Sequence, residues 1–132
     1  MQAITRLNKA THQLKLNYKT TLLVEQRGKI IPLSVNDISF FYLEKTMVKI
    51  CTQTNQSYYI TSSLDELERQ LDAELFFRSN RQFIICKNAT ANIERYFSRK
   101  LSVKLKTDTP ETIIISKAKA SEFLKWLQGV EC

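Results

Sequence analysis

The sequence predicts a mainly β fold, and three observations lead to this prediction. Short apolar or alternating runs recur along the 132 residues, and polar turn residues separate most of them. Two stretches carry apolar residues at clear helical spacing, one in the middle of the chain and one at its C-terminal end, and Ile4, Leu7 and Leu14 show a weaker helical pattern near the N-terminus. Many short strands joined by turns are typical of antiparallel sheets, and the pattern indicates a sandwich or a barrel rather than a parallel sheet.

The N-terminal part divides into a basic segment and two strands. Residues 1–20 contain no acidic residue and show weak apolar patterning, which predicts an N-terminal segment or interdomain linker ahead of one domain at 21–130. Thr21–Gln26 and Lys29–Leu33 are strand-like runs on either side of a glycine turn. Pro32 has no N–H for a central ladder, so the second strand is expected at a sheet edge or at a bulge.

Three strands and a short helix follow. The strands are expected at Ile38–Leu43, Met47–Thr52 and Ser57–Thr61. The period then changes, because Leu64, Leu67 and Leu71 recur at helical spacing and are expected to pack into the core. Ser63 stands at the N-cap with Glu66 three residues later, which is the pattern of a capping box.

The second half of the chain repeats the strand pattern and closes with a helix. Strands are expected at Phe83–Cys86, Ile93–Phe97, Lys100–Lys106 and Thr112–Ile115. In the stretch KLSVKLK the apolar residues alternate with serine and lysine, so one face of this strand is expected to be buried and the other solvated. Ser116 is expected to cap the last helix. The apolar side of that helix carries Ala120, Phe123, Leu124 and Leu127.

The charge distribution predicts an anionic partner. There are 20 Lys and Arg residues against 13 Asp and Glu residues, for a formal net charge of +7. Between Arg78 and Lys106 the only acid is Glu94, whereas acids cluster between Asp65 and Glu74. Nucleic acid, an anionic membrane surface or an acidic protein would complement such a surface. A solvated basic face without a partner is the alternative interpretation.

Composition and motifs argue against a membrane protein and against an enzyme. No apolar run approaches the length of about 18 residues that spans a membrane. The single histidine, His12, has no catalytic partner near it in the sequence, and there is neither a Gly-rich phosphate loop nor a nucleophile elbow. Cys51, Cys86 and Cys132 lack the spacing of a metal site, so no metal or cofactor is predicted. The first two cysteines are expected to be buried and the third exposed, in a reducing, cytoplasmic compartment.

Five stretches, taken in order, carry a family resemblance. They are NDISFFYLEKTMVKICT, SSLDELERQL, FFRSNRQFIIC, NIERYFSRKLSVKL and IIISKAKASEFLKWL. Through them the chain resembles the LytTR domain, the DNA-binding module of bacterial LytR/AgrA-type response regulators. The resemblance implies an elongated domain of several antiparallel sheets with a short internal helix and a C-terminal helix. It also implies that loops, rather than a recognition helix, enter two successive major grooves of duplex DNA.

The resemblance further implies which residues contact DNA. In chain order they are Lys45 and Thr46 in one loop, Arg78, Asn80 and Arg81 in a second, and Ser116 and Lys117 before the terminal helix. Arg81 would read a base edge, whereas Arg78 would orient its loop or meet a phosphate. Weaker candidates, for phosphate contacts, are Arg99, Lys100, Lys104 and Lys106.

Partners and departures follow from the same resemblance. It implies double-stranded promoter DNA with repeated sites, a homodimer on that DNA, and an upstream receiver domain that these residues do not contain.

The departures from the family are Asn80, Gln82 and Cys86, where histidine, serine and asparagine are frequent, and Lys117, where arginine is usual. They bear on which DNA sequence is bound, since lysine is a point charge rather than a planar fork. Two other functions stay open: an RNA-binding β domain that stacks bases on Tyr96 and Phe97, and a module for an acidic protein.

Overall fold

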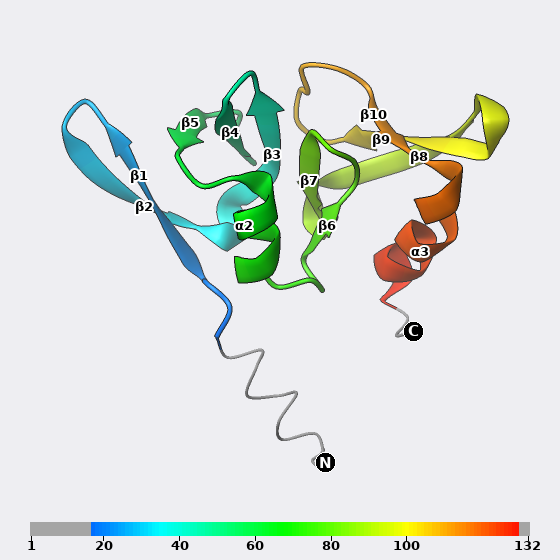
Figure 1. Cartoon of the computed structure of the whole chain (residues 1–132), viewed down its shortest axis with the longest axis horizontal. Helices are drawn as coiled ribbons and strands as arrows, with labels where there is room; N and C mark the ends of the chain where they lie inside the picture. The colour runs from blue at the N-terminus through cyan, green and yellow to red at the C-terminus, as the bar shows by residue number, and fades with distance from the viewer. Residues whose placement is uncertain (1–16, 130–132) are drawn as a thin grey trace, which may run out of the picture.

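The computed structural model describes residues 17–129, and this part of the chain is mainly β, as predicted (Figure 1). Its strands are β1 (Thr21–Gln26), β2 (Lys29–Ser34), β3 (Ile38–Glu44), β4 (Met47–Thr52), β5 (Ser57–Ile60), β6 (Phe76–Arg78), β7 (Phe83–Cys86), β8 (Thr90–Tyr96), β9 (Lys100–Leu105) and β10 (Ile113–Ile115). Its helices are α2 (Leu64–Gln70), α3 (Lys117–Gln128) and the short 3₁₀ turns η1 (Val35–Asp37), η2 (Lys87–Ala89) and η3 (Phe97–Arg99). All the predicted strands and both predicted helices are present, with ends that differ by a few residues. His12 and Cys132 lie outside the described residues.

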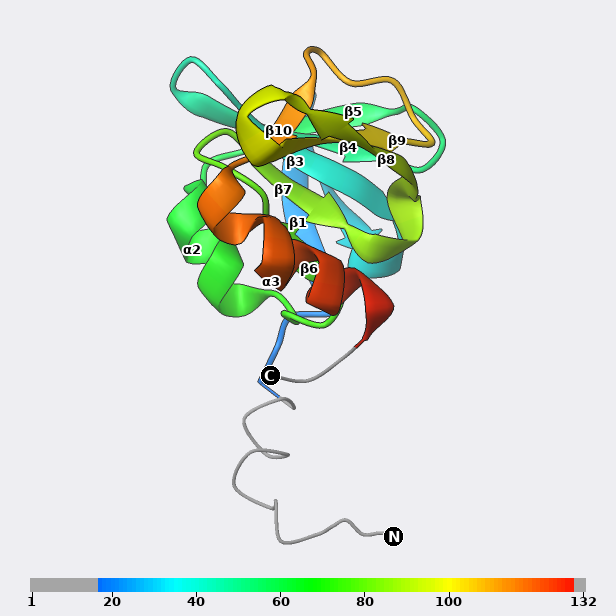
Figure 2. The ribbon, with the colours of Figure 1, turned by 90° about the vertical axis from the view of Figure 1, so that its right-hand side faces the viewer.

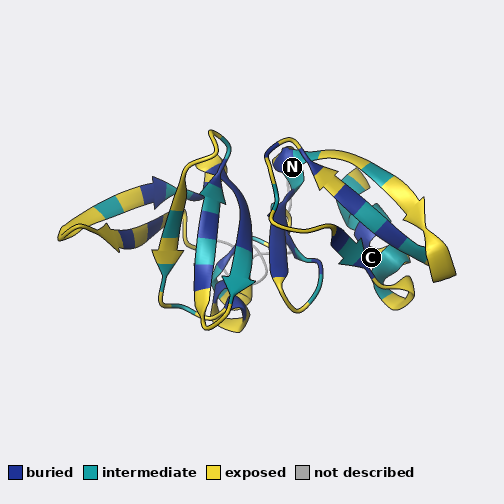
Figure 3. Ribbon diagram, turned by 90° about the horizontal axis from the view of Figure 1, so that it is seen from above, coloured by how far each residue is buried: buried dark blue, intermediate teal, exposed yellow. Residues whose placement is uncertain are grey.

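The strands form three antiparallel sheets that follow one another along the long axis of the molecule (Figures 1 and 3). The first is the hairpin β1–β2, the second has the order β5-β4-β3-β7-β6, and the third has the order β10-β9-β8. The closed barrel or sandwich expected from the strand pattern alone is therefore wrong, and the elongated multi-sheet fold is confirmed. The reason is that η1 and η2 redirect the chain between sheets, so each group of strands pairs within itself. Pro32 lies in β2, whose ladder is with β1, which confirms its edge position.

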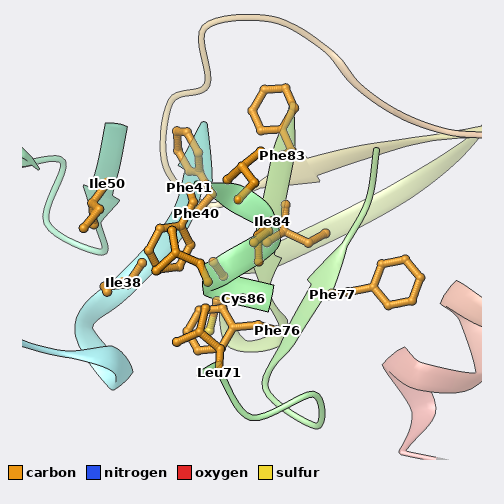
Figure 4. Close-up of a cluster of buried hydrophobic side chains, with 14 of the residues drawn as sticks. Ile38, Phe40, Phe41, Ile50, Leu71, Phe76, Phe77, Phe83, Ile84 and Cys86 are labelled. Atoms are coloured by element: carbon orange, nitrogen blue, oxygen red, sulfur yellow. The ribbon is translucent and has the colours of Figure 1, made fainter. Parts of the chain in front are cut away.

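Strand β6 was not predicted, and it connects two parts of the core. It pairs with β7 over its three residues. Successive side chains of a strand point to opposite faces, and the two phenylalanines of β6 do so. The Phe76 ring packs on Phe41 of β3, with 5.8 Å between centroids, and the Phe77 ring packs on Phe123 of α3 at 5.3 Å. Figure 4 shows Phe77 pointing away from the cluster that contains Phe41 and Phe76.

The helices begin as the sequence predicts, with one difference. The capping box of α2 is complete: the Ser63 hydroxyl accepts from the Glu66 N–H at 3.1 Å, and the Glu66 carboxylate accepts from the Ser63 N–H at 2.8 Å. Ser116 occupies the N-cap of α3, but its side chain makes no capping hydrogen bond, so that part of the prediction is wrong. Phe123 is fully buried on the predicted apolar face of α3.

The two described cysteines lie in β4 and β7, on either side of β3, and they differ in burial. Cys86 is buried at the end of β7, as expected, whereas Cys51 is only half-buried in β4. The reason is alternation, because Val48, Ile50 and Thr52 occupy the buried face of β4 and Cys51 the opposite face. Desolvation raises the pKa of both thiols above its ordinary value.

We expect a thiol reagent to modify Cys86 much more slowly in the native protein than in urea. Burial blocks access, and the raised pKa lowers the fraction of reactive thiolate at a given pH. Cys51 should react at an intermediate rate. Timed labelling followed by peptide mass spectrometry measures both rates in one sample. Rapid native labelling of Cys86 would mean that β7 is not part of the core.

Candidate nucleic-acid interface

Three of the loops singled out in the sequence open on one side of the molecule. The end of β3 pairs with the start of β7, and the Leu43 N–H donates to the Gln82 carbonyl oxygen at 2.9 Å. The β3–β4 turn and the β6–β7 turn therefore lie at the same end of the central sheet. Figures 2 and 3 place the start of α3 on this side too, at the left of Figure 2 and along the lower edge of Figure 3. We call this side the loop face.

The β3–β4 turn presents Lys45 and Thr46 to solvent. Both residues are exposed, and the strands on either side of them are held in register by the pair Glu44 and Met47. Lys45 has a φ of 58°, in the left-handed region that residues other than glycine rarely adopt. The tight hairpin thus places a lysine at its exposed tip.

The Arg78 side chain binds the backbone of the β6–β7 loop on the side that faces α2. Its Nε donates to the Asn80 carbonyl oxygen at 2.7 Å, and its Nη2 donates to the Arg81 carbonyl oxygen at 3.2 Å. Its Nη1 reaches the carboxylates of Asp65 and Glu68 on α2, at 2.8 and 3.1 Å. The Arg78 side chain is only 17% exposed, and its hydrogen bond holds the pKa of Asp65 below the ordinary range. The guanidinium therefore connects the loop to α2.

Asn80 closes the same loop and ties it to the third sheet. Its Oδ1 accepts from the N–H groups of Gln82 and Phe83, at 2.8 and 3.1 Å. Its Nδ2 donates to the Ile114 carbonyl oxygen of β10 at 3.0 Å. An amide side chain has two donor hydrogens and two lone pairs on its oxygen, so one N–H is left for an external partner.

Arg81 is the exposed residue at the tip of this rigid loop. Its carbonyl oxygen is held by Arg78, but within residues 17–129 its guanidinium has neither a hydrogen bond nor an ion pair. A fork of five N–H donors is thus presented to solvent from a backbone that is fixed on both sides. This arrangement suits bidentate contact with a base edge or a phosphate.

The start of α3 offers a second anion-binding group. Ser116 and Lys117 are exposed there, and the Ser116 hydroxyl leaves the first N–H groups of the helix uncapped. Free N–H groups and the helix dipole both favour an anion at this end. Lys119, one turn further on, donates to the Arg78 carbonyl oxygen at 2.9 Å and joins α3 to the loop. Lys119 was not among the residues predicted from the sequence, where its only signal was its position one turn after Ser116.

The structure divides the predicted phosphate contacts into two groups. A shallow hollow on the loop face is lined by Arg78, Ser79, Asn80, Arg81, Lys100, Ile114, Ser116 and Lys119. Lys100 thus lies beside the β6–β7 loop and the start of α3, and the exposed Arg99 precedes it. Lys104 and Lys106 follow at the other end of β9, where Lys104 lines a separate hollow together with Glu94 and Glu111.

Two other kinds of site are absent from the described part of the chain. No helix within residues 17–129 is long and apolar enough to cross a membrane. Nor do these residues bring together three or more His, Cys, Asp or Glu side chains that could hold a metal ion.

Comparison with known proteins identifies the family. The family model of the LytTr DNA-binding domain matches residues 28–128 of this chain. The sensory transduction protein LytT of Oceanobacillus iheyensis is 26% identical over 130 residues, which cover 97% of this chain and 53% of LytT. The transcriptional regulatory protein YpdB of Escherichia coli K12 is 28% identical over 103 residues, which cover 78% of this chain and 41% of YpdB.

A solved LytTr DNA-binding domain from Bacillus cereus has the same fold, with a TM-score of 0.70 and 21% identity over 83% of this chain and 97% of that domain. The chain spans about half the length of the curated relatives it matches. The family takes its name from DNA binding, not from a catalysed reaction. Because the family model matches most of its residues, this chain belongs to the LytTr DNA-binding domain family.

Proposed function

We propose that this chain binds duplex DNA in a sequence-specific way, by placing the loops of the loop face in successive major grooves. The observation that carries the proposal is the exposed guanidinium of Arg81 on a loop that Arg78 and Asn80 hold rigid. A preorganised arginine can bond to both O6 and N7 of a guanine without losing further conformational freedom. Family membership supports DNA as the partner.

The other loop residues have complementary roles in this proposal. Lys45, Thr46 and Lys117 contact base edges or phosphates on either side of Arg81, and Ser116 places a phosphate against the N–H groups of α3. Arg78 and Asn80 act from behind, by holding the loop. Among the remaining cations, Lys100 lines the hollow that it shares with Arg81 and Ser116. In this proposal Lys100 and the adjoining Arg99 contact phosphates, and Lys104 and Lys106 contribute more weakly.

The regulatory context is also a proposal. We infer that residues 21–130 are the output domain of a longer bacterial transcriptional regulator of the cytoplasm, in a two-component system. The names of LytT and YpdB, a sensory transduction protein and a transcriptional regulatory protein, support this. Residues 1–20 would then link the domain to an upstream receiver domain. Two copies of the chain would bind repeated sites in a promoter.

We expect binding to duplex DNA to weaken steeply with salt. Each phosphate neutralised contributes about −0.9 to the slope of log K against log salt concentration. The assay titrates the protein on duplexes selected from a randomised library and on scrambled duplexes over a salt series. Single-stranded RNA and heparin at matched salt serve as competitors. A slope near zero would contradict DNA binding, and preference for RNA or heparin would favour an RNA-binding domain or an acidic protein partner instead.

A further inference from the structure

The β8–β9 turn carries two exposed aromatic side chains that the core does not use. Phe97 is 67% exposed and Tyr96 is 40% exposed, and their rings stack with 4.6 Å between centroids. The turn is held by two consecutive left-handed residues, Ser98 at a φ of 60° and Arg99 at 63°. Residues other than glycine rarely adopt this backbone conformation, and it occurs mainly in tight hairpin turns such as this one.

Basic residues surround the aromatic pair. Arg95 and Arg99 are exposed, and the Lys100 Nζ lies 5.3 Å from the centroid of the Phe97 ring. Glu94 is the only acidic residue of β8 and η3. We call Arg95, Tyr96, Phe97, Arg99 and Lys100 the aromatic tip. Its charge complements an anionic partner that also offers apolar surface, and DNA has both in its phosphates and deoxyribose rings.

The aromatic tip lies next to the loop face, at the end of the molecule. Figure 1 shows the β8–β9 turn at the end of the molecule, beyond the start of α3, and Figure 3 shows the turn inclined toward the side on which the loops open. Lys100 lines the same hollow as Arg81 and Ser116. A duplex lying along the three loops would therefore reach the tip after it passes α3.

We propose that the aromatic tip is a fourth DNA-contacting element, which contacts the duplex next to the base pairs that the three loops contact. The inference rests on the proposed binding of DNA by the loop face. Arg95, Arg99 and Lys100 contact phosphates, and the Phe97 ring packs on deoxyribose of the adjoining backbone. Since phosphates and sugars are the same at every base pair, the tip adds affinity and length of contact without sequence preference.

The test compares Phe97→Ala and Arg99→Ala on a selected duplex with long flanks and on the same duplex trimmed at either end. Phe97→Ala is expected to weaken binding to the long duplex about tenfold with no change in salt slope, because the lost contact is apolar. Arg99→Ala is expected to make the slope shallower by about 0.9. Trimming the flank at the α3 end should remove both effects. Leu23→Ala, which alters a side chain 63% exposed on β1, is the matched control and should bind as the native protein does.

The possible failures are distinguishable. If the native protein binds with a steep salt slope and Phe97→Ala binds the long duplex equally well, the inference is wrong and the proposed function stands. If Phe97→Ala is impaired only on duplexes with two sites, the tip is a contact between protein copies and the inference is again wrong. If the native protein shows no salt-dependent binding, both proposals fail. Circular dichroism of each variant verifies the fold, which an exposed side chain should not alter.

Discussion

Replacing Arg81 by alanine is expected to remove about 1–3 kcal/mol of binding free energy on the specific duplex and much less on a scrambled duplex. The Arg81 guanidinium is exposed and without a partner in residues 17–129, so its loss leaves no internal group unsatisfied. On the proposed function, the substitution removes a bidentate contact that only the correct base provides. The ratio of specific to non-specific affinity should fall accordingly. The measurement is a paired titration on both duplexes over a salt series.

Lys104→Ala is the control for Arg81→Ala. Lys104 is also an exposed cation, but it lies on the polar side of β9, in a hollow that it shares with Glu94 and Glu111. Its loss should weaken binding to both duplexes by a similar, small factor and change the salt slope by at most one contact, about 0.9. If Arg81→Ala leaves the ratio of the two affinities unchanged, Arg81 does not read bases and the family correspondence at this position is wrong.

Replacing Asn80 by alanine is expected to destabilise the domain by about 1–3 kcal/mol and to lower specific binding as well. The substitution removes the acceptor of the Gln82 and Phe83 N–H groups and the donor to the Ile114 carbonyl oxygen. The Phe83 N–H and the Ile114 oxygen are partly buried, so losing their partner costs more than losing an exposed hydrogen bond. The β6–β7 loop would then be more mobile, and the Arg81 side chain would be less well positioned for binding.

Two measurements separate a positioning role of Asn80 from a base contact. Urea unfolding gives the free energy of unfolding, and hydrogen exchange reports the protection of the Gln82 and Phe83 amides without DNA. Both should fall in Asn80→Ala. Asn88→Ala, the same change at an exposed residue of η2, is the matched control and should alter neither. If Asn80→Ala loses only DNA affinity, the side chain acts on the bases directly.

Elements with local signals could be predicted from the amino-acid sequence. The alternation of Leu101, Val103 and Leu105 predicted a strand with one buried face, and all three are buried in β9. Ser63 and Glu66 predicted the start of α2 because a capping box is a contact between residues three apart. Strand β6 escaped prediction, since three residues are too few to show a period and the strand exists through its ladder with β7.

Only the folded chain shows how the elements group into sheets and which charged side chains are exposed and unpaired within the described residues. The division into three sheets depends on pairing between segments far apart in the chain, and no local pattern records it. Arg78 and Arg81 look alike in the sequence, yet Arg78 is occupied by Asp65 and Glu68 whereas Arg81 is free within the described residues. Asn80 likewise depends on Ile114, which lies 34 residues away. A hydrogen bond requires two atoms within about 3 Å, and only the folded chain brings such distant groups that close.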